Sequence, residues 1–450
     1  MRTRLPLLFA VLAPLAACSE PGLVVGDLEE VTVLKAIPNR DLDILFVIDD
    51  SASMADEQAA LAAAFPQMID VLGQVDGGLP NLHIGVITSD MGTSTTAGTI
   101  GPSVGSAGSG GCSGTGDGGV LQTVSAMTDR FLSDVDDQGT RVRNFTGELR
   151  DVFGELAQVG AQGCGFEQHL SAMQRSFEHP QNAGFVRPDA NLAIVILADE
   201  DDCSASSATL FAEDPALGRL SSFRCFEHGV TCDPDTTSAG DKTSCAPRED
   251  SPYVEGVEPF VQALLATKPD PRMVMVAAIV GDPDAVSVQH LPPPGGGAVV
   301  PTLAASCVYN DPNARSEAFP AVRLAGFLDA FPGRATLTSL CGDDLSSPLG
   351  TIGQSAKKLI GDPCLDTTLL ADSSPEPGIQ PSCEVVDIRD ADPDAPRSLA
   401  TCASGAADCY ELVADPVACP STPGNLRVRI QRATAVTDDT WTHVRCQRAQ

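Results

Sequence analysis

An apolar run that ends abruptly in oxygen-bearing side chains is the feature that most constrains the fold of this chain. Residues 44–48 read ILFVI, and Asp49, Ser51 and Ser53 follow at alternate positions. An uninterrupted apolar run bounded by polar residues is typical of a strand buried on both faces of a sheet. Because ligands of open α/β sheets bind beyond the carboxyl ends of the strands, we expect these three side chains at the functional edge.

The side chains after this run suggest two interpretations. One carboxylate and two hydroxyls form an all-oxygen donor set, which is the kind that Mg²⁺ prefers. The alternative is an acidic turn that precedes a helix, with Ser53 as the N-cap. The spacing of Asp49, Ser51 and Ser53 is compatible with both.

Further apolar runs, alternating with helical patterns, predict an α/β fold. Strand-like runs occupy residues 82–88, 192–197, 273–280 and 335–340. Amphipathic helices are expected at residues 56–72, 145–156, 166–177, 254–265, 322–331 and 347–360. This alternation predicts a doubly wound, mostly parallel sheet with helices on both faces. Pro66 lies inside the first helical segment and predicts a kink or a break there.

A second apolar run also ends in acidic residues. Residues 198–202 read ADEDD directly after the strand expected at 192–197. If the two strands are parallel neighbours, Asp49 and Asp199 face one crevice. Two carboxylates there repel each other unless a proton or a cation lies between them. The alternative is a set of acids that are simply solvated at the edge of the sheet.

These segments resemble a known family. The order strand, Asp49-x-Ser51-x-Ser53, helix is similar to the first loop of the metal-ion-dependent adhesion site of von Willebrand factor A domains, and Ala198-Asp199-Glu200 resembles a later loop of that site. The resemblance implies one divalent cation, Mg²⁺ or Mn²⁺ with Ca²⁺ as a further candidate, held by Asp49, Ser51, Ser53 and Asp199. It also implies that a carboxylate of a protein partner fills the open coordination position.

The sequence departs from the family pattern in one loop. The family has a threonine ligand in a middle loop, for which residues 160–165 are the expected counterpart, and Ala161 or Cys164 stands in its place. Neither side chain supplies a hard oxygen ligand. Three other carboxylates could help to hold the cation, although each is also explained as a plain surface acid: Asp90, Glu167 and Asp201.

The first residues predict export. Arg2 and Arg4 precede an apolar segment that is too short to span a membrane and ends in Leu15-Ala16-Ala17-Cys18. This ending resembles a bacterial lipobox, which implies a signal peptide over residues 1–17 and a lipid on Cys18. The alternative is an ordinary secretory signal cleaved near Ala16-Ala17. We expect a protein of the cell envelope that contacts the membrane through its lipid anchor only.

The cysteines predict disulfide bonds. The chain has 15 cysteines, and 14 remain if Cys18 carries lipid. An even number in an exported chain is typical of a disulfide framework. Close neighbours are expected to pair, as in Cys402–Cys409 and Cys225–Cys232.

The same sequence suggests a division of the chain. We expect a tether over residues 18–40 with one strand at 31–35, and a von Willebrand factor A-like domain over residues 41–361. This domain carries a cysteine-rich insertion at residues 203–253. A small β-rich, disulfide-held module then occupies residues 362–450.

Composition excludes several functions. The net charge is −32, from 60 acidic and 28 basic residues, so nucleic acid and anionic lipid head groups repel the chain. Aromatic residues make up only 4%, which disfavours a base-stacking platform. None of the six histidines belongs to a recognisable catalytic motif, and His169 is expected on an exposed helix face.

Three hypotheses for the function follow. We favour an exported, lipid-anchored protein that is not an enzyme and binds a protein ligand through a divalent cation. The alternative is a metal-independent structural or assembly protein of the cell envelope whose metal site is degenerate. A hydrolase with a metal-activated water is the third.

Overall fold

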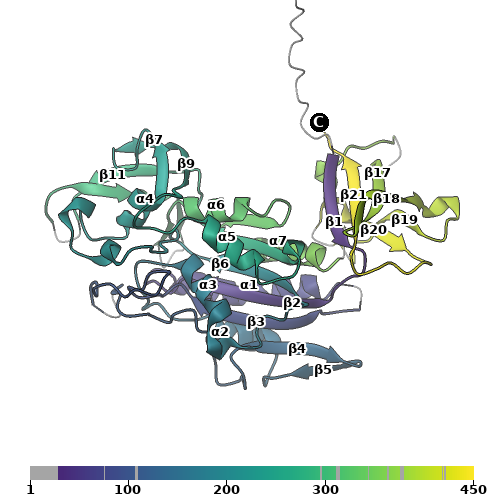
Figure 1. Ribbon diagram of the computed structural model, residues 1–450, viewed down its shortest axis with the longest axis horizontal. Coiled ribbons are helices and arrows are strands. Elements are labelled where there is room, and N and C mark those ends of the chain that lie inside the picture. Colours follow the sequence, from purple (N-terminus) through teal and green to yellow (C-terminus); the bar gives the residue numbers. More distant parts are fainter. Residues whose placement is uncertain are drawn as a thin grey trace, which may run out of the picture.

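The computed structural model describes residues 29–449 apart from 76, 107–109, 294–295, 311–314, 343, 362–363, 375–379, 418 and 420–421. The predicted signal peptide and Cys18 lie outside the described residues. Figure 1 shows a central sheet with its helices, a lobe of short elements at one end and a second sheet at the other. No helix in the described part of the chain is both long and apolar enough to cross a membrane.

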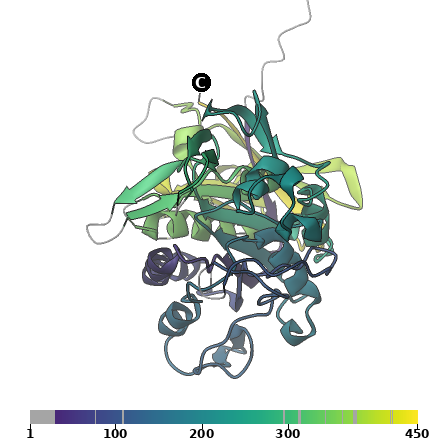
Figure 2. The same ribbon diagram turned by 90° about the vertical axis from the view of Figure 1, so that its left-hand side faces the viewer.

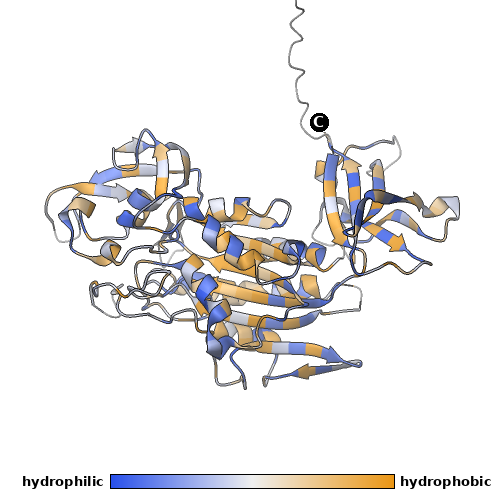
Figure 3. Ribbon diagram, in the orientation of Figure 1, coloured by the Kyte–Doolittle hydropathy of each residue, from blue (hydrophilic) through white to orange (hydrophobic). Residues whose placement is uncertain are grey.

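The central sheet is mixed and has the strand order β15-β10-β6-β2-β3-β4-β5. Five strands run parallel: β2 (Asp41–Ile48), β3 (Asn81–Thr88), β6 (Asn191–Leu197), β10 (Val274–Val280) and β15 (Ala335–Ser339). Two antiparallel strands extend one edge: β4 (Leu132–Asp137) and β5 (Thr140–Arg143). The prediction of a mostly parallel sheet therefore holds for the centre and not for this edge. β6, β2 and β3 are strongly hydrophobic in Figure 3.

Helices pack on both faces of this sheet because side chains alternate across each strand. From β2, Phe46 points into a core formed with α1 (Ala55–Leu72), α2 (Leu149–Leu156) and α7 (Ser346–Leu359). The next residue, Val47, points into the opposite core with α3 (His169–Glu178), α5 (Glu258–Leu265) and α6 (Val322–Asp329). The predicted break at Pro66 is wrong, since α1 continues through that residue.

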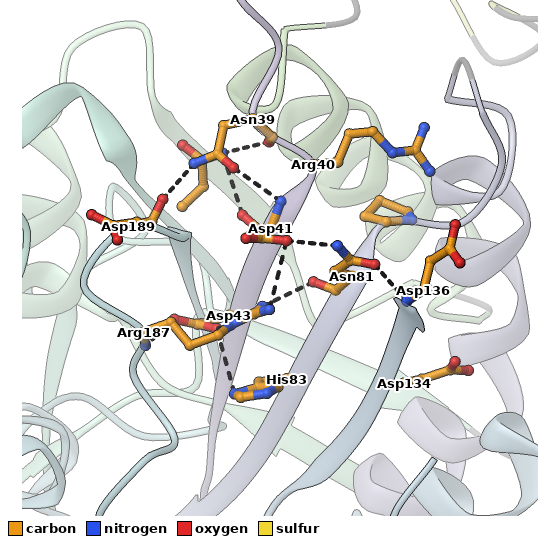
Figure 4. Close-up of polar contacts among 12 residues, drawn as sticks. Asn39, Arg40, Asp41, Asp43, Asn81, His83, Asp134, Asp136, Arg187 and Asp189 are labelled. Atoms are coloured by element: carbon orange, nitrogen blue, oxygen red, sulfur yellow. Dashed lines mark hydrogen bonds and ion pairs between the residues drawn. The ribbon is translucent and has the colours of Figure 1, made fainter. Parts of the chain in front are cut away.

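Buried ion pairs close the amino-terminal end of the central strands. Figure 4 shows Asp43 of β2 between His83 and Arg187. The Asp43 carboxylate accepts hydrogen bonds from Arg187 Nε at 2.8 Å and from Lys268 Nζ at 3.2 Å. The side chains of Asp43 and Lys268 are fully buried, and buried charges persist only when they are paired in this way. The opposite, carboxyl-terminal end of the strands carries the loops of the predicted site.

The described residues form seven disulfide bonds, so the prediction that the 14 cysteines pair is confirmed. The bonds are Cys112–Cys164, Cys203–Cys225, Cys232–Cys245, Cys307–Cys341, Cys364–Cys419, Cys383–Cys446 and Cys402–Cys409. The Cys402–Cys409 pair is as predicted. The prediction that Cys225 pairs with Cys232 is wrong, because the antiparallel strands β7 (Val230–Asp233) and β9 (Thr243–Pro247) bring Cys232 to Cys245 instead. Such a disulfide content is typical of an exported or extracellular protein.

The cysteine-rich insertion forms a lobe with a hairpin from later in the chain. The hairpin consists of β11 (Ser287–Leu291) and β12 (Val300–Leu303), and β8 (Gly240–Asp241) of the insertion pairs with β11. We call residues 203–253 with this hairpin the insertion lobe; it contains α4 (Phe223–Gly229) and faces the viewer in Figure 2. A second short hairpin joins β13 (Cys307–Asn310) to β14 (Arg315–Ala318).

The second sheet unites the two ends of the described chain. Its strand order is β1-β21-β17-β18-β19-β20-β16. The strands are β1 (Glu29–Lys35), β16 (Cys364–Leu365), β17 (Cys383–Arg389), β18 (Asp392–Thr401), β19 (Cys409–Ala414), β20 (Leu426–Gln431) and β21 (Thr440–Gln447). β1 pairs with β21 along its whole length. The strand expected in the tether is therefore present, and it belongs to the C-terminal sheet.

Candidate metal centre

Two neighbouring strands deliver the predicted carboxylates to one place. β2 and β6 pair in parallel with Ile48 opposite Leu197, and the Asp49 N–H extends this ladder by donating to the Leu197 carbonyl at 2.9 Å. Asp49 and Asp199 follow these strand ends. One oxygen each from Asp49, Asp199 and Glu200 lie within 4.8 Å of one another. We call these three residues the acid cluster.

The first loop presents its hydroxyls to the acid cluster. The Ser51 N–H donates to Asp49 Oδ1 at 2.7 Å, and the Ser51 and Ser53 hydroxyl oxygens lie 3.1 Å apart. Helix α1 has Met54 at its N-cap with no side-chain hydrogen bond, so Ser53 does not cap the helix. Ser53 interacts with Asp199, which partly offsets the rise in the pKa of that carboxyl. The loop therefore keeps the Ser53 hydroxyl beside Asp199 and the Ser51 hydroxyl beside that of Ser53.

Several oxygens of the site are buried and accept no hydrogen bond from the described residues, although His169 Nε2 lies 3.8 Å from one of them, Asp49 Oδ2. They are Asp49 Oδ2, Asp199 Oδ1 and Glu167 Oε1, on residues with exposed fractions of 0%, 2% and 1%. A buried carboxylate oxygen without a partner is costly, and native structures rarely leave one. Burial, followed by the charges of Asp49 and Glu200, holds the pKa of Asp199 well above its usual range. Because hard divalent cations bind to oxygens of this kind, the residues present fit such a cation.

Of the three auxiliary carboxylates, the structure places Glu167 beside the acid cluster. Burial and the neighbouring Glu200 and Asp49 raise the pKa of Glu167 well above normal. Asp201 instead accepts hydrogen bonds from the Arg323 and Leu324 N–H groups, at 2.8 and 3.0 Å, at the start of α6. It is committed to that helix.

Asp90 belongs to a separate group of carboxyls. Its Oδ1 accepts from the Gly92 N–H at 2.7 Å, and burial followed by the charge of Asp117 accounts for its raised pKa. Nearby Asp50 has its pKa raised to about 8, by burial and then by the charges of Asp90, Asp49 and Asp117. Asp90 is thus not brought to the acid cluster.

The middle loop contributes backbone contacts. Gly160 exchanges two hydrogen bonds with the Gln58 side-chain amide, and the Gly163 N–H donates to the Asp50 carbonyl at 2.8 Å. A Cβ at Gly163 would lie 2.3 Å from the Asp50 carboxyl carbon, so glycine is required at this close approach. Cys164 is bonded to Cys112. The loop packs against the first loop, and neither Ala161 nor Cys164 carries a side-chain oxygen at the expected threonine position.

His169 is the residue on which sequence reasoning was wrong. It was expected on an exposed face, yet it is fully buried, and its Nε2 lies 3.8 Å from Asp49 Oδ2. Burial alone would lower the pKa of His169, but the neighbouring Asp49 carboxylate outweighs it and the pKa is raised. The segment before it is held from both sides, since Gln168 N–H donates to Ser89 O and Cys203 N–H donates to Glu167 O. These contacts come from distant residues, so local sequence could not reveal them.

Glu200 was not predicted as a ligand either. The signal for it was present, because the acidic run at residues 198–202 follows a buried strand directly. Which of these acids turns toward the first loop depends on the path of the chain after β6.

No protein-family model and no curated protein matches the chain. Structural neighbours include a von Willebrand factor type A protein from Catenulispora acidiphila, with 11% identity, a TM-score of 0.28, and coverage of 93% of this chain and 65% of that one. A second neighbour is human Sec24c of the COPII coat, with 8% identity, a TM-score of 0.31, and coverage of 92% of this chain and 40% of that one. A third is the pilus adhesin RrgA from Streptococcus pneumoniae, with 10% identity, a TM-score of 0.23, and coverage of 93% of this chain and 57% of that one. The chain spans less than two thirds of each of these proteins. Similarities this low do not assign it to a family.

Proposed function

We propose that this chain is an exported, lipid-anchored protein of the cell envelope that binds a protein ligand through a divalent cation. Asp49, Ser51, Ser53 and Asp199 would hold Mg²⁺ or Mn²⁺, with Ca²⁺ as a further candidate. The observation that supports the proposal is the convergence of Asp49 and Asp199 from adjacent strands, each with a buried oxygen that accepts no hydrogen bond from the described residues.

The coordination number leaves room for a partner's carboxylate. Mg²⁺ requires near-octahedral coordination by six oxygens. The four proposed ligands leave two positions for water or for an oxygen of the partner. Glu200 and Glu167 lie next to these ligands and can accept hydrogen bonds from coordinated water, which is the usual task of outer-shell carboxylates.

Calorimetric titration of Mg²⁺ and Mn²⁺ into a soluble chain that begins at Ser19 tests the metal. We expect saturable binding by the native chain and none by Asp49→Ala. Asp56→Ala is the matched control, because Asp56 is an exposed acid of the first turn of α1. Equal, negligible heats for the native chain and Asp49→Ala would contradict the proposal.

The lipid anchor has its own test. Radiolabelled palmitate should be incorporated into the native precursor, and Cys18→Ser should lose the label. Incorporation that persists in Cys18→Ser would contradict lipidation at this residue.

One observation favours the second candidate, a metal-independent structural or assembly protein of the cell envelope. The middle loop, residues 160–165, supplies no oxygen ligand from the side chains at the expected threonine position. Partner capture that persists in excess chelator would support this candidate over the first. We propose no catalysis at the site, and turnover that Asp49→Ala abolishes would contradict that part of the proposal.

A further inference from the structure

A cavity of about 570 Å³ adjoins the acid cluster on the side of the insertion lobe. Its walls are mainly apolar and include Phe223 and Phe226 of α4, Leu291 of β11 and Phe319. Glu200 also lines it, together with Glu167 and Asp201. Because Glu200 belongs to the acid cluster as well, the cavity and the candidate metal centre share a wall.

The cavity has a buried polar end and an exposed apolar mouth. Glu167 is 1% exposed, whereas Leu291 is 45% exposed, and nearby Val299 is 62% exposed. Large apolar side chains left in water around a concavity are typical of interaction sites. Figures 1 and 2 show the lobe that carries this mouth standing beside the carboxyl-terminal end of the central sheet.

The walls of the cavity are fixed by contacts that hold the insertion lobe in shape. The buried Arg224 guanidinium donates to five backbone carbonyls, namely those of Leu210, Ala212, Leu217, Gly218 and Arg219. The Cys203–Cys225 disulfide ties α4 to the segment that follows the acid cluster. Arg323 Nη2 bonds the Asp202 carboxylate at 2.9 Å and also the Glu255 carbonyl. The wall formed by α4 is therefore shaped before a ligand arrives, which reduces the entropy cost of binding there.

We propose that this cavity receives a bulky apolar side chain of the same partner segment whose carboxylate binds the cation. The inference rests on the proposed function and names the chemistry of its ligand. The wall shared through Glu200 places the two contacts side by side. An extended segment advances about 3.3 Å per residue, so two adjoining contacts correspond to residues that lie a few positions apart in the segment.

Charge decides against two other occupants. A second carboxylate in the cavity would be buried against apolar walls, beside three carboxyl groups and without a cation, so an anionic group is accommodated only on the metal. A basic side chain would be drawn to these acids, but the exposed Arg219 at the mouth and the cation beside Glu200 both oppose it. A neutral side chain matches the apolar walls.

Fluorescent peptides provide the probe. Each peptide is a glycine-rich segment with one Asp and one Phe, and the Phe lies one, two or three positions before or after the Asp. Two matched sets of peptides carry Ser or Lys in place of Phe. Binding is measured by fluorescence polarisation in Mg²⁺ and again in EDTA. We expect at least one Phe peptide to bind about tenfold tighter than its Ser counterpart, which is the gain typical of burying one large apolar side chain.

Two cavity variants and one matched control complete the design. Ser222 is exposed, lines the cavity and makes no capping bond, so Ser222→Trp fills the cavity without removing a core contact. Leu291→Ser removes a wall, and Leu337→Ser is its control because the two leucines are 45% and 44% exposed. The Phe advantage should vanish in Ser222→Trp, fall severalfold in Leu291→Ser and persist in Leu337→Ser.

The outcomes separate this inference from the proposed function. Equal binding of Phe and Ser peptides in Mg²⁺ would overturn the proposal that the cavity receives an apolar side chain, and would leave the proposed metal site uncontradicted. Tighter binding of the Lys set would overturn it in favour of a basic side chain. A Phe advantage that survives in EDTA supports the cavity and contradicts the metal. No binding by any peptide overturns the inference.

Discussion

Replacing Asp199 with asparagine should stabilise the protein without metal and abolish its response to metal. The change keeps the shape of the side chain and removes one charge from the acid cluster, whose oxygens lie within 4.8 Å of one another. At an effective dielectric constant of about 20, two charges at that separation repel by about 3 kcal/mol. Part of this repulsion is already relieved by proton uptake, because the pKa of Asp199 is raised. We therefore expect a gain of about 1–3 kcal/mol in the free energy of unfolding in EDTA.

The gain should depend on pH. A carboxyl whose pKa is raised in the folded state binds its proton more tightly there than in the unfolded chain, so the native protein loses stability as the pH rises above the ordinary value of 3.8. The amide that replaces this carboxyl in the Asp199→Asn variant cannot titrate. The difference between variant and native protein should therefore widen from pH 5 to pH 8.

Metal should stabilise the native protein alone and so offset the advantage of the variant. A ligand at about 100 times its dissociation constant stabilises the folded state by about 2.7 kcal/mol. Urea unfolding in Mg²⁺ and in EDTA measures both effects. Asp201→Asn is the control: it weakens the start of α6 and should keep the full Mg²⁺ response, because Asp201 binds the Arg323 and Leu324 N–H groups. An Asp199→Asn variant that is less stable than the native protein in EDTA, or that responds fully to Mg²⁺, would refute the reasoning.

Three further changes test the rest of the structure. Asp43→Asn should cost about 3–5 kcal/mol in urea unfolding, because it removes the charge that pairs with the buried Lys268 and the partly exposed Arg187. A weakened Mg²⁺ response in this variant would contradict the assignment of Asp43 to the closed end of the sheet. Burial lowers the pKa of His83 from 6.5, so stability should fall below pH 6.5 as the unfolded chain takes up a proton; His83→Gln should flatten this fall, and an unchanged pH profile would contradict it. Opening the Cys383–Cys446 bond by double Ala substitution should cost about 4 kcal/mol, against about 2.5 kcal/mol for Cys402–Cys409, because the closed loops span 63 and 7 residues. Trp441, the single tryptophan, lies in β21 and reports this unfolding by fluorescence; equal losses would contradict the loop-entropy explanation.

The central strands could be predicted closely because burial on both faces demands an unbroken apolar run. The strand expected at 273–280 is observed as Val274–Val280, and the one expected at 192–197 as Asn191–Leu197. The edge strands β4 and β5 escaped prediction. Their sequences, LSDVDD and TRVR, carry the charged residues typical of sheet edges and not an apolar run.

The site was partly readable for the same reason. Asp49 and Asp199 could be placed at one edge because each follows a buried strand, and the strands prove to be neighbours. The burial of His169 could not be predicted from the local sequence, because it depends on Ser89 and Cys203, which are distant in the chain and hold the two preceding residues in place. The cavity wall from β11 and β12 was equally hidden, since that hairpin joins the insertion lobe through contacts between distant residues, namely pairing with β8 and packing against α4.

The sequence by itself determined the apolar strands, the oxygen donors that follow them and the even number of cysteines. Each of these depends on the residues of a short segment, or on a count of one residue type, and not on how the chain folds. Tertiary structure alone decided which acids meet: Glu200 joins Asp49 and Asp199, while Asp201 turns to α6 and Asp90 to another group. It also decided that β1 completes the C-terminal sheet. These outcomes depend on contacts between residues far apart in the chain, whose free energies no short segment encodes.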